Sequence, residues 1–189
     1  MAIPKVFISS TCYDLQEVRE SLSAFIKSQG FDPVLSERGD VYYGPDQHTH
    51  DACVQEVSNC QLFILIIGGR LGGQYITDEK KSVTNAEYDA AMKCGIPVFT
   101  YIKKDVLENH HFYQVNRDKS CVVELDFPAL QKNADAPSIF NFINSVRGAS
   151  INNAYEGFEV VRDIEIHLRK QWASTVSYTH LTLPTIYSV

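Results

Sequence analysis

Glu87 is the residue of this sequence whose position most directly raises the question of a chemical role. It lies in SVTNAEYDAAMKCG (82–95), a segment predicted to form a short helix between a glycine-rich stretch and an apolar run. The four residues TNAE fit a capping box, with Thr84 as N-cap and Glu87 three positions later, and Val83 and Tyr88 would form a hydrophobic staple. Two hypotheses stay open: Glu87 caps a helix, or it is the reactive group of a nucleotide site.

Two further segments carry groups that bind phosphate or ribose. SSTCYD (9–14) places the hydroxyls of Ser9, Ser10 and Thr11 directly after an apolar run, either at a helix N-terminus that binds phosphate or in a simple turn. The segment GGRLGG brings glycines, which allow a ligand close to the backbone, and one fixed cation, Arg70. We expect these groups to bind substrate, although Arg70 pairing with a surface acid is the alternative.

The segment HTHD (48–51) has a histidine spacing that could hold a metal ion. On a helix, His48 and His50 would face apart, and no third ligand stands out in the sequence. We therefore predict no metal site and no metal cofactor.

The elements that must position these residues alternate between strand and helix patterns, which predicts an α/β fold with right-handed crossovers. The predicted strands are 5–9, 31–36, 61–67, 96–102 and 150–155, and the predicted helices are 14–30, 50–59, 82–94, 104–116, 137–147 and 156–172.

The expected fold is a flavodoxin-like three-layer sandwich with a five-stranded parallel sheet in the order 2-1-3-4-5 (TIR-like). Pro33 cannot donate to a ladder and belongs in an edge strand, whereas QLFILII (61–67) is apolar without alternation and belongs inside the sheet. In this order the sheet reverses between strands 1 and 3, so a ligand is expected at their carboxyl ends. Those ends carry the hydroxyls of 9–11 and Arg70.

The composition excludes several classes of partner. The 189-residue chain has a formal net charge of −6, which argues against nucleic acid as its main partner, and no apolar run approaches the length of a membrane span. Its five cysteines follow no C-x-x-C spacing, and no signal peptide is evident. We expect reduced thiols, a cytoplasmic location and no membrane partner.

An ordered set of motifs resembles a TIR-like domain family of unassigned function. The motifs are FISSTCYDL (7–15), IGGRLGG (67–73), SVTNAEYDAA (82–91) and CGIPVF (94–99). The resemblance covers residues 4–103 well and continues loosely to about 173.

This resemblance implies a function. Catalytic TIR domains cleave the nicotinamide–ribose bond of NAD⁺, and their essential glutamate corresponds in position to Glu87. Many of them carry Trp-Cys where this chain has Val83 and Thr84, so the aromatic group that stacks on nicotinamide is expected to be Tyr43 or Tyr75. The resemblance thus implies an NAD⁺-cleaving signalling enzyme, with NAD⁺ as substrate rather than cofactor, that acts as a homo-oligomer in bacterial defence or stress signalling.

Two other functions remain open. A non-catalytic TIR-like interaction module of a longer receptor would use Glu87 as a cap only. The related deoxyribosyltransferase fold uses a glutamate at this position as nucleophile on a nucleoside, so a nucleoside N-deoxyribosyltransferase is the third hypothesis.

The last residues differ sharply in composition from the rest of the chain. No charged residue occurs in ASTVSYTHLTLPTIYSV (173–189), and VSYTHLTLPT resembles translated adapter read-through. We predict a TIR-like domain over 1–173 and a non-native tail over 174–189, with a genuine flexible tail as the alternative.

Overall fold

Five parallel strands form the centre of the molecule. The computed structural model describes residues 3–11, 13–46, 48–78, 81–119, 122 and 124–182, with side chains as far as residue 174. The strands pair in the order β2-β1-β3-β4-β5, which confirms the predicted α/β fold and strand order. The strands are β1 (Lys5–Ser9), β2 (Asp32–Val34), β3 (Leu62–Ile67), β4 (Val98–Lys103) and β5 (Tyr155–Phe158).

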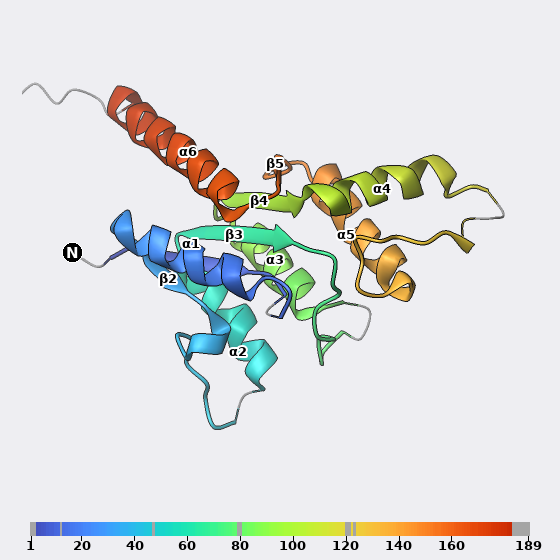
Figure 1. Cartoon of the computed structure of the whole chain (residues 1–189). Helices are drawn as coiled ribbons and strands as arrows, with labels where there is room; N and C mark the ends of the chain where they lie inside the picture. The colour runs from blue at the N-terminus through green and yellow to red at the C-terminus, as the bar shows by residue number, and fades with distance from the viewer. Residues whose placement is uncertain are drawn as a thin grey trace, which may run out of the picture.

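Helices cover both faces of this sheet (Figure 1). Apolar residues of α1 and α6 pack in one core cluster, and those of α2, α3, α4 and α5 pack in the other. The α-helices are α1 (Gln16–Ser28), α2 (Thr49–Glu56), α3 (Val83–Cys94), α4 (Lys104–Asn116), α5 (Ala136–Gly148) and α6 (Val161–Thr182). Short 3₁₀ turns are η1 (Ser36–Arg38), η2 (Val57–Asn59) and η4 (Asn133–Asp135). Within the described part of the chain, none of the helices combines the length and apolarity needed to cross a bilayer.

The alternation of side chains along β1 decides where its end residues face. Val6 and Ile8 belong to the cluster with α1 and α6, whereas Phe7 belongs to the cluster with α2 and α3. Because successive side chains of a strand point to opposite faces, Ser9 lies on the same face as Phe7. This register directs the Ser9 hydroxyl toward α3, the helix that carries Glu87.

The prediction for the fifth strand, 150–155, was wrong in its position. The strand is Tyr155–Phe158, and the preceding residues form the turn into it. Asn152 adopts a left-handed conformation (φ 53°), and its side chain accepts from the Val98 backbone N–H and donates to the Ile96 carbonyl. β5 is an edge strand with two exposed residues at its start, so it lacks the apolar run that marks an interior strand.

Candidate active site

A cavity of about 370 Å³ opens at the carboxyl ends of β1 and β3. The strand order reverses here, since β1 lies between β2 and β3, so the cavity occupies the place where the topology predicts a ligand. Its volume lies within the range of roughly 300–1,000 Å³ that is typical of small-molecule sites. Its lining residues are Ile8, Ser10, Thr11, Tyr13, Arg19, Ser36, Glu37, Tyr43, Thr49, His50, Cys53, Arg70, Gly72, Gly73, Val83, Thr84 and Glu87.

Glu87 contributes a buried carboxyl group to this cavity. The residue is 5% exposed, and the Ser9 hydroxyl donates a hydrogen bond of 2.5 Å to its Oε2. Burial raises the pKa of Glu87 to about 7, although the Ser9 hydrogen bond and the charge of Arg19 act to lower it. The group therefore exchanges a proton in the neutral range, as acids and bases in active sites commonly do.

Helix capping does not explain this position, because the N-cap of α3 lies two residues before the predicted one, Thr84. That N-cap is Ser82, whose Oγ accepts from the Asn85 backbone N–H at 3.2 Å. Thr84 is consequently the second helical residue and Glu87 the fifth, beyond the turn in which a side chain can reach the free N–H groups. The predicted capping box and the Val83–Tyr88 staple were both wrong.

The three predicted hydroxyls lie together, but each already has a partner within the protein. Ser9 donates to Glu87 and does not line the cavity. Ser10 and Thr11 do line it; Ser10 donates to the Thr11 carbonyl at 3.0 Å, and Thr11 donates to the carboxylate of Asp14. The Ser10 oxygen also accepts from Arg19 at 2.8 Å, whereas the Thr11 oxygen keeps its acceptor sites. Because both hydroxyl protons are used within the protein, Thr11 suits a sugar hydroxyl better than a phosphate.

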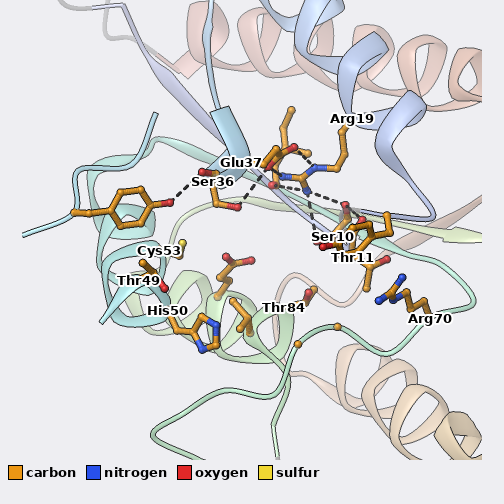
Figure 2. A pocket seen from close by; sticks show the side chains of 17 residues that line it. Ser10, Thr11, Arg19, Ser36, Glu37, Thr49, His50, Cys53, Arg70 and Thr84 are labelled. Carbon is orange, nitrogen blue, oxygen red and sulfur yellow. Dashed lines mark hydrogen bonds and ion pairs between the residues drawn. The ribbon is translucent and has the colours of Figure 1, made fainter. Parts of the chain in front are cut away.

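An arginine–glutamate pair in the cavity wall was missed by the sequence analysis (Figure 2). Arg19 is 2% exposed, and its guanidinium forms two hydrogen bonds with the Glu37 carboxylate, of 2.6 and 2.5 Å. Burial acts to raise the pKa of Glu37, but Arg19 outweighs it and holds the pKa below its usual value. The signal was present in the sequence: Arg19 lies four residues after Leu15 and three before Leu22, on the apolar stripe of α1.

Arg70 supplies a second cation to the cavity. Its guanidinium lies over the Tyr13 ring at 4.6 Å from the centroid, and among the described residues it forms no ion pair. Only glycine fits at the preceding position, 69, without a shift, because a Cβ at Gly69 would lie 1.9 Å from the Ala129 backbone oxygen. Gly69 thus allows the loop to pack against the segment before α5 and fixes the position of Arg70.

The two predicted aromatic residues occupy different positions. Tyr43 lines the cavity, and its hydroxyl donates to the Ser36 carbonyl at 3.0 Å. Tyr75 is not among the lining residues; its hydroxyl donates to Asp51 at 2.7 Å, and its ring stacks on His50 at 6.4 Å. Tyr43 therefore lies in the cavity wall, whereas Tyr75 lies behind it against His50.

His50 lines the lower part of the cavity in Figure 2, near Thr49 and Cys53. Burial lowers its pKa, so the imidazole is neutral at pH 7. The rings of His48 and His50 lie edge to face, 4.6 Å apart, rather than facing apart as predicted. Within the described residues, no group of three His, Cys, Asp or Glu side chains is arranged to hold a metal ion.

Comparison with known proteins gives a family and a distant structural likeness. Residues 5–173 match the model of a family described as "Domain of unknown function (DUF4062)". The chain thus belongs to a family whose function is unassigned, as predicted, whereas the TIR-like character of that family stays a prediction. Among solved structures, the chain is similar to the CMP N-glycosidase BcmB of Clostridium botulinum, with 12% identity over 88% of this chain and 98% of that chain and a TM-score of 0.47. The comparison with curated proteins finds no match.

Proposed function

We propose that this chain, which belongs to the DUF4062 family, cleaves the N-glycosidic bond of a nucleotide, with NAD⁺ as its substrate. The observation that carries the proposal is Glu87. Its carboxyl group is buried in the wall of a cavity at the switch point of the sheet, and it has a hydrogen bond from Ser9 that fixes its orientation. Desolvation of a carboxylate destabilises the folded protein, so a role in the cavity is the better explanation for keeping it.

In this mechanism Glu87 acts on the ribosyl carbon. When the bond between C1′ and the nicotinamide nitrogen breaks, the electron pair leaves with nicotinamide, whose ring becomes neutral, and positive charge develops on the ribose. The ionised Glu87 carboxylate stabilises that charge, and a water molecule then adds its hydroxyl to C1′ and releases a proton. The pKa of about 7 leaves a substantial fraction of Glu87 ionised at neutral pH.

The other lining residues fit parts of a dinucleotide. Arg70 is the cation for the diphosphate, since guanidinium groups bind phosphate oxygens in pairs. Tyr43 lies on the wall where the base would stack, and the Thr11 oxygen offers an acceptor to a ribose hydroxyl, with Ser10 beside it. The protein is expected to act as a homo-oligomer, so activity should rise when the protein is concentrated or clustered.

The test is to incubate concentrated protein with NAD⁺ and to follow the products by liquid chromatography. Release of nicotinamide in the absence of any added base supports the proposal, with Glu87→Gln as the inactive control. Turnover of a deoxynucleoside that requires a free base would instead identify an N-deoxyribosyltransferase. Concentration-dependent self-association without turnover would identify an interaction module.

A further inference from the structure

The segment after β2 presents a carboxylate to the cavity in a fixed orientation. Glu37 follows the end of β2 at Val34 by three residues, and both of its oxygens accept from Arg19. Arg19 is itself held by the Ile8 carbonyl at 3.2 Å and the Ser10 hydroxyl at 2.8 Å. The Glu37 side chain is nevertheless 37% exposed. The buried Arg19 guanidinium thus orients the Glu37 carboxylate, and a ligand in the cavity can still reach that carboxylate.

The chemistry of this carboxylate suits a pair of hydroxyl groups. An ionised carboxylate offers about four lone-pair sites. Arg19 donates to both Glu37 oxygens, and the Ser36 hydroxyl donates to Oε2 over a long distance of 3.4 Å. Arg19 also keeps the pKa of Glu37 below its usual value, so the group stays an acceptor at neutral pH. A vicinal diol could donate to Oε1 and, in place of the long Ser36 contact, to Oε2. In dinucleotide-binding folds of the Rossmann type, an acidic side chain likewise accepts from the ribose 2′-hydroxyl.

The positions of the other charged groups indicate how a ribose would be oriented in the cavity. Glu37 and Glu87 line the same cavity from different elements, and the negative charge of Glu37 contributes to the raised pKa of Glu87. Arg70 lies beside Thr11, away from Glu37 (Figure 2). A ribose between the two carboxylates would therefore have its C1′ at Glu87, its diol at Glu37 and its 5′-phosphate directed to Arg70.

We propose that Glu37, oriented by Arg19, binds the 2′- and 3′-hydroxyls of ribose and makes the site selective for ribonucleotides over 2′-deoxyribonucleotides. The direction of the bound nucleotide rests on the proposed function, but recognition of the diol does not require bond cleavage. Arg19 is a positioning residue in this account, because it acts through Glu37.

Titration of the unaltered protein with ribose 5-phosphate and with 2-deoxyribose 5-phosphate tests the proposal without a mutation. Removing one donor from a pair with a charged acceptor leaves that acceptor unsatisfied, so the ribose compound should bind about tenfold to a hundredfold more tightly. Equal affinity for the two compounds, including no detectable binding of either at millimolar concentration, would overturn it.

Variants then assign the preference to Glu37. Glu37→Asp keeps the charge beside Arg19 but withdraws the carboxylate by one methylene group. The preference for ribose 5-phosphate over 2-deoxyribose 5-phosphate should then fall to about threefold or less, the effect of a weak hydrogen bond. Glu37→Gln should have the same effect, and Glu56→Asp is the matched control because Glu56 pairs with Lys5 outside the cavity. A full preference retained in Glu37→Asp would contradict the proposal even if Glu37→Gln failed to fold.

The outcomes also separate this inference from the proposed function. Preference for ribose without nicotinamide release would leave the inference standing and remove the NAD⁺-cleaving function. Nicotinamide release combined with equal binding of both sugar phosphates would support the NAD⁺-cleaving function and remove the inference about Glu37.

Discussion

Glu87 and Arg70 are both charged side chains of the cavity wall that pair with no opposite charge among the described ion pairs. The Glu87 carboxyl is buried with one hydroxyl as its hydrogen-bond donor. Arg70 contacts an aromatic face but, among the described residues, no carboxylate. Both residues were predicted from motif and position alone. The Arg19–Glu37 pair was missed because its partners come from α1 and from the turn after β2, and sequence spacing does not show which side chains of separate elements meet.

The raised pKa of Glu87 predicts a specific dependence of stability on pH. The pKa is about 7 in the folded protein against a reference value of 4.5, so the folded state retains a proton that the unfolded state releases. The contribution of Glu87 to stability is complete below about pH 4.5 and is lost as the pH rises to about 7. Glu87→Gln should therefore gain in free energy of unfolding over the parent by up to about 3 kcal/mol between pH 5 and pH 8.

Urea unfolding of both proteins across this pH range measures the difference. A difference between variant and parent that stays constant with pH would mean that Glu87 titrates normally, and the argument from its burial would fail.

Arg70→Ala should weaken the binding of ADP-ribose by roughly 1.5–3 kcal/mol, the range for hydrogen bonds to a charged group, because the diphosphate loses its cation. The melting temperature should change little, since Arg70 has no ion pair among the described residues. Arg147→Ala is a matched control, because Arg147 also lies over a tyrosine ring, that of Tyr155, and does not line the cavity. Equal affinities of Arg70→Ala and the parent in titration calorimetry would remove Arg70 from the site.

At the scale of elements, strand order and type were predictable, while the exact starts of elements were not. QLFILII and Pro33 sufficed to place an inner and an edge strand. The N-cap of α3 was predicted two residues too late, because both Ser82 and Thr84 are good N-caps. With Ser82 as the cap, the Val83 N–H bonds to the Gly73 carbonyl in the preceding loop, a contact that the helix pattern does not show. Of the two hypotheses for Glu87, the capping role therefore fails, and the residue lies in the cavity wall.

The loop that carries Arg70 offers a test of how closely it is packed. Gly69→Ala would place a Cβ 1.9 Å from the Ala129 backbone oxygen, so the loop or the segment before α5 must shift. We expect a loss of about 1–3 kcal/mol in free energy of unfolding, as for other overpacked sites, together with weaker nucleotide binding. Gly73→Ala is the control, since a Cβ there meets nothing within 4 Å. Equal stability of the two variants in urea would show that the loop does not depend on this contact.

At the scale of the whole molecule, the sheet brings together residues that are far apart in the sequence. Hydroxyls near residue 10, a carboxylate at 37, a cation at 70 and a carboxylate at 87 all reach one cavity because β1 lies between β2 and β3. The C-terminal boundary predicted at 173 remains a prediction. The family match ends at residue 173, but α6 continues to Thr182, and the side chains beyond residue 174 lie outside the described part.

Truncation tests that boundary. Removal of everything after Thr175 should change the melting temperature by less than about 2 °C, which corresponds to under about 1 kcal/mol in a domain of this size. Removal of Trp172 as well should lower it far more, because its ring packs against Phe25 and Phe31 in the core with α1. A large drop in the first truncation, measured by differential scanning calorimetry, would show that the tail contributes to the core.

The rate of nicotinamide release from NAD⁺ by the parent protein and by Glu87→Gln, measured side by side at neutral pH, tests the central claim most directly. The account predicts turnover by the parent and a loss of roughly a hundredfold or more in the variant, because Gln lacks the charge that faces the ribosyl cation. The variant should remain folded and still bind ADP-ribose. Equal rates in the two proteins, or no release by the parent even when clustered, would contradict the claim that Glu87 is the catalytic group of an NAD⁺-cleaving site.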